Sequence, residues 1–554
     1  MTGSSGSASV FDAIRRAGLL DPTALAALTA AAAVWGPTTA APYAAAAVRH
    51  PNRTAVIDDY GSITFRQLEW RTTRLAGGLR SVGVGRGDAI GLLCRNHRAF
   101  VETTIAAAKI GARTVFLNTG LPASQLTEVI AREAIGVVIA DADLADQLIV
   151  ASTTRVVIAA PEADPRWSFP DIPRWRPLVQ LPRPLGGAEP VVLTSGTTGA
   201  PKGTRRSIRP GASIAALGFV EAIPYERGDV FALPAPLFHA WGLSQMVLAA
   251  TLAGTIVLRR SFDPDDVAAD IEVHGATVLA AVPVMLHRIL ESAGTETSDL
   301  SSLRVVATSG SALPGDLALR WMNRHGDTLY NLYGSTEVGQ VSVAAPTDLR
   351  QVPGTAGRPL RGIRLRIVDE QHSPVARNVV GQIVIESAMH FDGYTDGGNK
   401  TILDGFMVIG DQGHLDDEGR LFVSGRHDDM IISGGENLFP SNIERSLLSH
   451  AAVAEAVVVG PPDIDLGQRV RAVIVCDASM KQESTAALTK SIKDHLRHDL
   501  AGFEIPREFV YVADLPRNEA GKVLRRELVG PIRSIPHKRR GPDKPRSVKQ
   551  KAKS

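Results

Sequence analysis

Cysteine is almost absent from this 554-residue sequence, which has only Cys94 and Cys476. The two stand far apart and lack the close spacing of metal ligands. We therefore expect neither a disulfide framework nor a cysteine-based zinc site. So few cysteines suit a reducing compartment, and we expect a cytoplasmic protein.

An excess of charge of one sign is also missing. The 60 basic residues nearly balance the 58 acidic ones, which leaves a formal net charge of +2. A balance this close does not provide the basic surface that nucleic acids attract. We expect no nucleic-acid partner for the body of the protein.

Long apolar runs are missing as well. The alanine-rich stretch Ala24–Val34 follows Arg15 and Arg16 as a secretory signal would, but Asp21 and Pro22 interrupt it. No run reaches the eighteen strongly apolar residues of a membrane span. We expect an amphipathic helix that packs on the body of the protein, and no transmembrane segment.

What the sequence does contain is typical of a globular protein, with 44% hydrophobic and 21% charged residues. Strand-like runs such as Gly136–Ala140 and Thr277–Val282 alternate with helical patterns such as Phe100–Lys109, which predicts an α/β architecture. From about Gly362 the pattern becomes richer in short strands, which indicates a small barrel-like or distorted sheet.

A chain of this length exceeds a single hydrophobic core. We predict a large N-terminal domain over residues 1–425, in which 1–45 are peripheral, and a smaller α+β domain over 426–530. Residues 531–554 are rich in proline and basic residues, and we expect a disordered tail. Weak attraction of this tail to an anionic membrane surface is the secondary interpretation.

The most informative motif is a loop of small polar residues that follows the apolar run Val191–Leu193. Its residues include Thr194, Ser195, Gly196, Thr197, Thr198, Gly199 and Lys202. Glycines let backbone N–H groups approach an anion, hydroxyls add donors, and the lysine adds a full charge. The loop predicts a polyphosphate site, although a flexible surface loop is the common fate of such a composition.

This loop resembles the signature loop of the adenylate-forming superfamily, which includes acyl-CoA synthetases, firefly-type luciferases and peptide-synthetase adenylation domains. Further motifs of that superfamily follow in order, and the resemblance extends from about Ile63 to Arg526. It implies a large N-terminal domain of stacked α/β subdomains plus a small β-barrel-like subdomain. It also implies that the α+β C-terminal domain is a mobile lid.

The second motif of the resemblance runs from Asn331 through Gly334 to Glu337. The resemblance implies that Tyr333 stacks on adenine, that Thr336 binds the α-phosphate and that Glu337 coordinates Mg²⁺. It likewise assigns further residues to the ATP site. These are Asn331, Gly334, Gly310 and Ser311.

The later motifs supply the ribose contacts and the lid. The resemblance assigns Asp411 to the ribose hydroxyls and Arg426 to the ribose or a phosphate. Val408 and Ile409 stand where the superfamily usually has an aromatic residue and a threonine. The resemblance also makes Asp428 the hinge, Gly434 and Gly435 contacts of CoA, and Lys522 the lysine that stabilises charge during adenylation.

The segment around His239, Trp241 and Gly242 resembles the lining of the carboxylate pocket, together with Gly310. A general base is not required, because the substrate is already a carboxylate at neutral pH. We assign His239 to shaping or gating the pocket, with a hydrogen-bonded structural histidine as an equal alternative.

Together these motifs predict an AMP-forming acyl-CoA synthetase that uses ATP, Mg²⁺ and CoA and releases pyrophosphate. The predicted pocket is rich in small residues and lacks charge, so we rank a medium- or long-chain fatty acid first and an aromatic acid as the alternative. An acyl-AMP ligase that loads a carrier protein is a second reading. A non-catalytic relative would require the loss of Lys202, Glu337 or Lys522, and all three are present.

Overall fold

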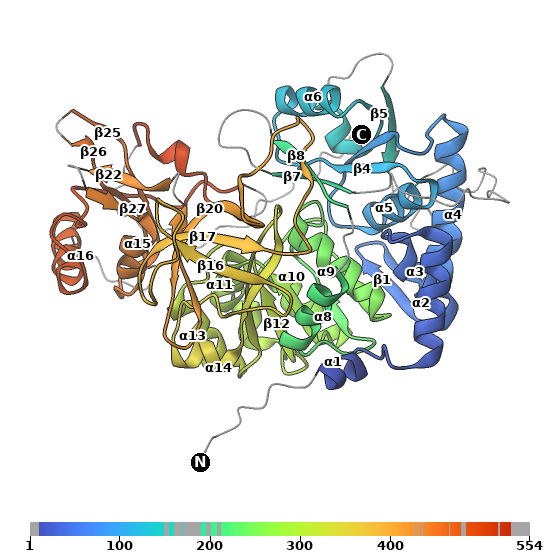
Figure 1. The fold of residues 1–554 in the computed structure, drawn as a ribbon, viewed down its shortest axis with the longest axis horizontal. Helices are drawn as coiled ribbons and strands as arrows, with labels where there is room; N and C mark the ends of the chain where they lie inside the picture. Colours follow the sequence, from blue (N-terminus) through green and yellow to red (C-terminus); the bar gives the residue numbers. More distant parts are fainter. Residues whose placement is uncertain are drawn as a thin grey trace, which may run out of the picture. The chain divides into compact units, whose positions relative to one another are not determined.

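The computed structural model describes residues 10–148, 154–159, 169, 190–194, 201–207, 212–426, 429–433, 436–464, 466–477, 484–518 and 521–532. The chain divides into two compact units. The first comprises Met1–Val423 together with the short segment Asn518–Lys522, and the second comprises Ser424–Arg517 and Val523–Ser554. Figure 1 shows the helices and strands of both.

A nine-stranded sheet runs through the first unit in the order β15-β14-β13-β12-β11-β9-β10-β1-β2. Its strands are β1 Thr54–Asp58, β2 Gly61–Thr64, β9 Val230–Ala232, β10 Thr255–Val257, β11 Val278–Ala281, β12 Val305–Thr308, β13 Leu329–Ser335, β14 Gly339–Ala344 and β15 Arg358–Pro359. From β13 to β1 every neighbouring pair is parallel. The carboxyl ends of these strands therefore share one edge.

A second sheet of the first unit has seven strands in the order β18-β8-β7-β4-β3-β5-β6. Its strands are β3 Ala89–Leu93, β4 Arg113–Phe116, β5 Ile135–Asp141, β6 Arg155–Ala159, β7 Val191–Thr194, β8 Lys202–Arg205 and β18 Gly393–Tyr394. The short strand β18 comes from far along the sequence and pairs antiparallel with β8. This pairing brings Tyr394 opposite Thr204, two residues after Lys202.

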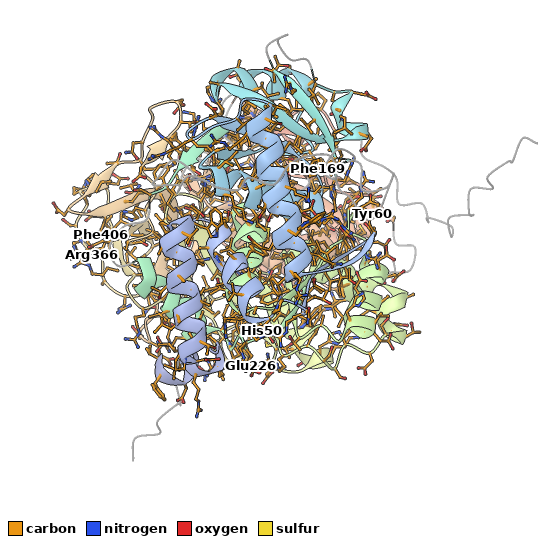
Figure 2. All side chains as sticks on the ribbon, turned by 90° about the vertical axis from the view of Figure 1, so that its right-hand side faces the viewer. His50, Tyr60, Phe169, Glu226, Arg366 and Phe406 are labelled. Atoms are coloured by element: carbon orange, nitrogen blue, oxygen red, sulfur yellow. The ribbon has the colours of Figure 1, made fainter. Side chains whose placement is uncertain are left out.

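The third sheet is antiparallel and has the order β16-β17-β20-β19, with β21 beside β20. Its strands are β16 Arg364–Val368, β17 Gly381–Glu386, β19 Ile402–Leu403, β20 Phe406–Leu415 and β21 Leu421–Arg426. It corresponds to the β-rich region expected from about Gly362. The guanidinium carbon of Arg366 lies 4.3 Å from the centre of the Phe406 ring, and Figure 2 labels both residues.

Fourteen described helices belong to the first unit. They are α1 Val10–Arg16, α2 Pro22–Trp35, α3 Ala40–Arg49, α4 Phe65–Ser81, α5 Arg98–Ile110, α6 Ala123–Arg132, α7 Ala142–Ala145, α8 Ala212–Ala222, α9 Ala240–Thr251, α10 Pro264–His274, α11 Pro283–Glu291, α12 Ala293–Thr297, α13 Gly315–His325 and α14 Pro346–Gln351. All thirteen residues of α5 are buried. A helix forms at the predicted N-terminal position, α2, and it lies beside α3 (Figure 1). Its exposed side carries Leu25 and Val34, so the helix is not amphipathic as predicted.

The second unit has two small sheets of its own, in the orders β23-β22-β26-β25 and β24-β27-β28. Its elements are β22 Ile431–Ser433, β23 Glu436–Leu438, α15 Pro440–Leu448, β24 Val453–Val459, β25 Pro462–Asp463, β26 Gly467–Gln468, β27 Arg471–Cys476, α16 Thr485–Asp499, β28 Glu508–Tyr511 and a 3₁₀ helix Arg525–Leu528. Ile443 of α15 and Ile492 of α16 are fully buried in a core that also contains Ile474 of β27. The unit is α+β.

The fold class predicted from the sequence is confirmed by this arrangement of a large α/β unit and a smaller α+β unit. Within the part of the chain that the structure describes, no helix is both long and apolar enough to cross a membrane. The predicted domain boundary at residue 425, the mobility of the lid and the disorder of the tail stay predictions, and residues 533–554 lie outside the described residues.

A buried ion pair connects β1 with the start of α5. The Arg98 guanidinium donates to the Asp58 carboxylate through Nε at 3.0 and 2.9 Å and also through Nη2. The Arg98 backbone N–H donates to the same carboxylate at 2.8 Å. The two side chains are 2% and 0% exposed, so the loss of either partner leaves a buried charge without compensation.

We expect Asp58→Asn to lower the free energy of unfolding of the first unit by about 3–5 kcal/mol, because Arg98 stays buried without its counter-charge. Urea unfolding followed by tryptophan fluorescence measures this change. The matched control is Arg361→Gln, which removes the pair that Arg361 forms with Glu221 while 53% exposed, with an expected cost below about 1 kcal/mol. Equal effects of the two exchanges would contradict the role given to the buried pair.

Candidate active site

The predicted site residues of the first unit gather at the carboxyl ends of parallel strands. Thr308 ends β12 and is paired with Asn331 of its neighbour β13, while Thr194 ends β7 of the seven-stranded sheet. Small molecules commonly bind at this edge of open α/β sheets, because the strand ends and helix starts expose polar groups there. The strand order therefore brings residues distant in the sequence to the same edge.

Tyr333 and Asp411 are in direct contact although 78 residues separate them. The Tyr333 hydroxyl donates to Asp411 Oδ2 at 2.6 Å, and both side chains are half-buried. Tyr333 lies on β13 and Asp411 on β20, so this hydrogen bond joins the nine-stranded sheet to the antiparallel sheet. The residues predicted to contact adenine and ribose are thus neighbours.

Tyr394 connects two other predicted residues, Glu337 and Lys202. Its hydroxyl donates to Glu337 Oε1 at 2.8 Å. The Lys202 ammonium lies 5.6 Å from the centre of its ring and 2.8 Å from Asp396 Oδ2. The hydrogen bond from Lys202 is the main reason why the pKa of Asp396 is below its usual value. Neither Tyr394 nor Asp396 could be selected from the sequence, because only the pairing of β18 with β8 places them here.

Arg206 is a third residue that the sequence analysis did not select. Its Nη2 donates to the carbonyl oxygen of Thr336 at 2.5 Å. Burial lowers the pKa of this guanidinium, while the charges of Glu337 and Asp392 oppose that shift. A cation therefore lies beside the predicted metal ligand and holds the backbone that carries it. Arg205 and Arg206 follow one another in the sequence, and nothing in that pattern indicated that Arg206 contacts the Thr336 carbonyl.

The remaining predicted nucleotide contacts occupy distinct positions. The Asn331 amide is buried and donates to the carbonyl of Thr355 at 3.1 Å. At Gly334, a Cβ atom would lie 2.3 Å from the carbonyl oxygen of Gly339, so a side chain cannot be accommodated in this hairpin. Gly310 has φ +91°, and it is exposed together with Ser311 just beyond β12.

His239, Trp241 and Gly242 begin α9. The Trp241 indole N–H donates to the carbonyl of Ala281 at the end of β11, at 3.1 Å. A Cβ atom at Gly242 would lie 2.3 Å from the carbonyl oxygen of Pro236, which keeps α9 against the preceding loop. Both contacts fix the orientation of the first turn of α9.

The alternative role considered for His239 was a structural histidine with its ring nitrogens hydrogen-bonded, and the Nε2 atom differs from that expectation. Its Nε2 atom is buried, and it has no hydrogen-bond partner among the described residues. Burial lowers the pKa of His239 from 6.5 to about 4. The imidazole is therefore neutral at physiological pH, with one polar atom left unused by the fold.

Several predicted residues lie outside the described residues. They are Ser195, Gly196, Thr197, Thr198, Gly199, Asp428, Gly434 and Gly435. Thr194 and Lys202 bracket the predicted phosphate loop and are opposite each other across β7 and β8, where the Thr194 hydroxyl donates to the Lys202 carbonyl at 3.2 Å. Arg426 ends β21 and belongs to the second unit. The Lys522 backbone N–H donates to Asn518 Oδ1 at 2.9 Å.

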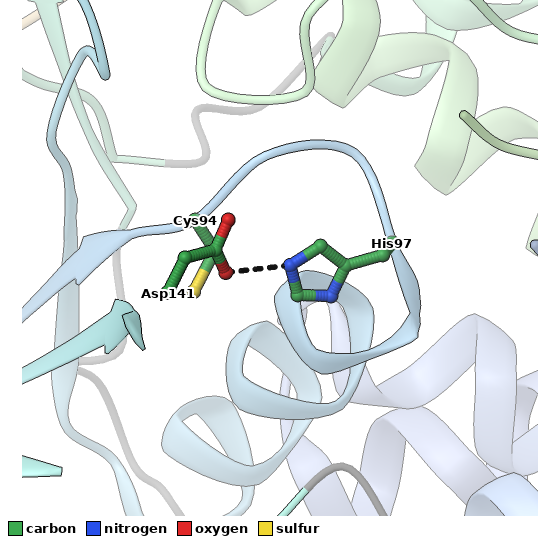
Figure 3. A group of neighbouring side chains, drawn as sticks. All are labelled: Cys94, His97 and Asp141. Atoms are coloured by element: carbon green, nitrogen blue, oxygen red, sulfur yellow. Dashed lines mark hydrogen bonds and ion pairs between the residues drawn. The ribbon is translucent and has the colours of Figure 1, made fainter. Parts of the chain in front are cut away.

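A buried group of Cys94, His97 and Asp141 lies beyond β3, and the sequence spacing gave no sign of it (Figure 3). His97 Nδ1 accepts the backbone N–H of Ala99 at 3.3 Å, so Nε2 carries the proton and donates to Asp141 Oδ1 at 2.7 Å. The group is therefore a hydrogen-bonded connection between α5 and β5.

Asn96, in the same loop, holds the segment that leads to His239. Its amide donates to the carbonyl of Ala235 at 3.0 Å, and its Oδ1 accepts the N–H of Leu237 at 2.9 Å. All these groups are buried, so their hydrogen bonds are costly to break. This connection passes from the loop after β3 to the predicted acid pocket.

Comparison with known proteins identifies the family to which both units are similar. A family model described as AMP-binding enzyme matches residues 43–395, and a model described as AMP-binding enzyme C-terminal domain matches 442–522. The chain is 32% identical to a 2-succinylbenzoate–CoA ligase of Bacillus cereus, over 86% of this chain and 95% of that protein. It is 30% identical to a feruloyl-CoA synthase of an Amycolatopsis species, over 86% and 96%.

A solved structure extends the comparison to three dimensions. The o-succinylbenzoate CoA synthetase of Bacillus subtilis, in complex with its acyl-adenylate intermediate, matches with a TM-score of 0.76 and 26% identity. The match covers 89% of this chain and 99% of that one.

The state of His239 predicts a pH effect on stability. The unfolded chain takes up a proton at His239 near pH 6.5 and the folded chain near pH 4, so protonation in this interval favours unfolding. We expect the stability of the wild type relative to His239→Gln to fall by about 2 kcal/mol between pH 7.5 and pH 5. Urea titrations at the two pH values measure it, with the exposed His372→Gln as a surface control. Parallel pH profiles for the wild type and His239→Gln would contradict the lowered pKa.

Proposed function

Since the chain belongs to the AMP-binding enzyme family, we propose that it is an ATP-dependent CoA ligase that activates an aromatic carboxylic acid. The observation that carries this proposal is the meeting of four separate stretches of sequence in one place. Tyr333 contacts Asp411, and Tyr394 contacts both Glu337 and Lys202. Among them, Tyr333, Asp411, Glu337 and Lys202 are the side chains assigned to adenine, ribose, metal and phosphate.

The charges at this place suit the chemistry of adenylation. A carboxylate resists attack by a thiol, because oxide would have to leave. Transfer of AMP to the acid provides a better leaving group and places negative charge on the phosphate oxygens and on pyrophosphate. Lys202 and the hydroxyl of Thr336 would stabilise that charge through position and electrostatics, without a covalent enzyme intermediate.

Magnesium fits the residues present. Glu337 offers a carboxylate, the hard oxygen ligand that Mg²⁺ prefers, and Tyr394 donates to one of its oxygens and so orients it. Bound Mg²⁺ would supply positive charge for the phosphates of ATP. Arg206 holds the adjacent Thr336 carbonyl, so the carboxylate stays on a fixed backbone.

Lys522 is assigned to the adenylation step. Before the CoA step, its side chain has to leave the site. The thiol of CoA has to reach the acyl carbon that the lysine side chain would otherwise cover. Rotation of the C-terminal domain about Asp428, with Gly434 and Gly435 beside the pantetheine arm, is the proposed route to the second step.

The aromatic acid replaces the fatty acid that the sequence analysis ranked first. The similar relatives are named for 2-succinylbenzoate and feruloyl-CoA, and both names denote aromatic acids. We assign Trp241 to the wall of the acid pocket, where an indole fixed by its hydrogen bond to the Ala281 carbonyl would suit a flat ring. Gly310, exposed at the end of β12, leaves space on the same edge of the sheet.

A panel of acids tests the reaction and the substrate class together. We expect pyrophosphate release in the presence of CoA to be at least tenfold faster, as kcat/KM, for benzoates and cinnamates than for fatty acids, with the aryl-CoA identified by mass spectrometry. Faster turnover of fatty acids would overturn the aromatic assignment alone. Release of an acyl-adenylate without thioester would favour the carrier-loading ligase, and no pyrophosphate with any acid would overturn the ligase.

Lys522→Ala separates the two steps. We expect adenylation to slow by about 10²–10³-fold, because the charge on the transition state loses its lysine. Thioester formation from added acyl-adenylate should stay within about threefold of the wild type, since Lys522 leaves before that step. Single-turnover assays measure each step, with the exposed Lys490→Ala of α16 as control. Equal losses in both steps would refute the assignment.

A further inference from the structure

The end of the predicted phosphate loop lies among four charged side chains of the first unit. Lys202 begins β8, and its ammonium is 2.8 Å from Oδ2 of Asp396, which lies in the turn after β18. Arg132 ends α6, which Figure 1 shows above β8. Its Nη2 donates to the carbonyl of Pro201, and its Nε is 3.2 Å from Glu133 Oε1. Two cations therefore meet two carboxylates at this point, and their charges cancel.

The two carboxylates differ in how freely they can exchange partners. Glu133 is buried, and it accepts hydrogen bonds from the Thr395 hydroxyl as well as from Arg132. The pair of Lys202 with Asp396 is more open, because 39% and 29% of these side chains are exposed. An ion pair that water reaches contributes little to stability. Lys202 can therefore exchange Asp396 for another anion at small cost.

Asp396 uses its two carboxylate oxygens for separate contacts. Oδ1 accepts the backbone N–H of Gly398 at 3.0 Å and so holds the turn after β18. Oδ2 contacts the Lys202 ammonium. The hydrogen bond from Lys202 lowers the pKa of Asp396, so its carboxyl group is ionised at neutral pH. The turn needs one oxygen of this side chain but not its negative charge.

The negative charge of Asp396 acts on any phosphate that Lys202 binds. The ammonium has three N–H donors, so a phosphate oxygen can contact it while Asp396 stays. Two oxygens in contact with one ammonium are at most about 6 Å apart, since each N–H···O contact is about 2.8 Å long. Like charges at that distance repel, and partial exposure to water weakens the repulsion without removing it. Asp396 therefore opposes phosphate binding whether the ion pair persists or breaks.

We propose that Asp396 is a positioning residue that limits the affinity of Lys202 for the polyphosphate and so favours the release of pyrophosphate. The inference rests on the proposed function, in which Lys202 stabilises the phosphate charge of ATP. As pyrophosphate leaves, the Asp396 carboxylate replaces it as the partner of the ammonium, so Lys202 keeps a counter-charge. AMP retains the α-phosphate alone, which is assigned to Thr336, and its binding should not depend on Asp396.

Asp396→Asn tests the proposal, because it keeps Oδ1 for the turn and removes the charge at the Oδ2 position. We expect the full chain with this exchange to bind Mg·ATP and Mg·pyrophosphate about three- to tenfold more tightly than the wild type, because the repulsion is lost. Its affinity for AMP should stay within about twofold of the wild type. Isothermal titration calorimetry without an acid substrate measures all three affinities. The matched control is Asp327→Asn, since Asp327 also pairs with a cation, Arg350, at 2.8 Å.

A double exchange shows whether Asp396 acts through Lys202. In a Lys202→Ala background, Asp396→Asn should change the affinity for Mg·ATP by less than about twofold. Asp396→Ser is the second single variant, because a serine hydroxyl also accepts from the backbone in turns of this kind. It should tighten the binding of Mg·ATP as Asp396→Asn does.

The outcomes separate this inference from the proposed function. Unchanged or weaker binding of Mg·ATP in Asp396→Asn and Asp396→Ser would overturn the inference alone, and so would an equal gain in affinity for AMP. A wild type that binds no ATP and releases no pyrophosphate with any acid would overturn the proposed function, and the inference with it.

Discussion

The buried polar loop after β3 is the constraint on which the arrangement of the first unit depends. Its consecutive residues Asn96, His97 and Arg98 bond to three different parts of the chain, and each bond is shielded from water. A polar group buried in this way cannot exchange partners without a penalty of about 1–3 kcal/mol. The hydrogen bonds of these three side chains therefore fix the two large sheets and the loop before α9 relative to one another.

This constraint explains how the candidate active site is kept in place. The parallel strands supply an edge, but an edge alone does not determine the distance between residues on different sheets. Hydrogen bonds from Tyr333 to Asp411 and from Tyr394 to Glu337 set those distances. Asn96 fixes the segment that precedes His239, because its Oδ1 accepts the backbone N–H of Leu237. Polar contacts between sheets, added to apolar packing beneath them, give the site a defined geometry.

The sequence was sufficient for the fold class, while the residues that the motifs assign to the site stay predictions. Alternating strands and helices predicted the α/β unit. The motifs assigned both Tyr333 and Asp411 to the nucleotide, and the two side chains are in contact. Tyr394 and Asp396 could not be predicted, since only the pairing of β18 with β8 places them here. Arg206 could not be predicted either, since its contact with the Thr336 carbonyl joins residues 130 positions apart. The contact between His97 and Asp141 was hidden for a similar reason, because a hydrogen bond between residues far apart in the sequence leaves no periodic pattern.

The position of Tyr394 between Lys202 and Glu337 has a consequence for the history of such enzymes. The face of the Tyr394 ring contacts the Lys202 ammonium, and the Tyr394 hydroxyl donates to the Glu337 carboxylate. The interactions of all three residues therefore depend on the position of this one ring. A drift at any one of them changes the surroundings of the other two. Descendants of this chain should therefore inherit the three together or replace them together, and a mixed inheritance should be selected against.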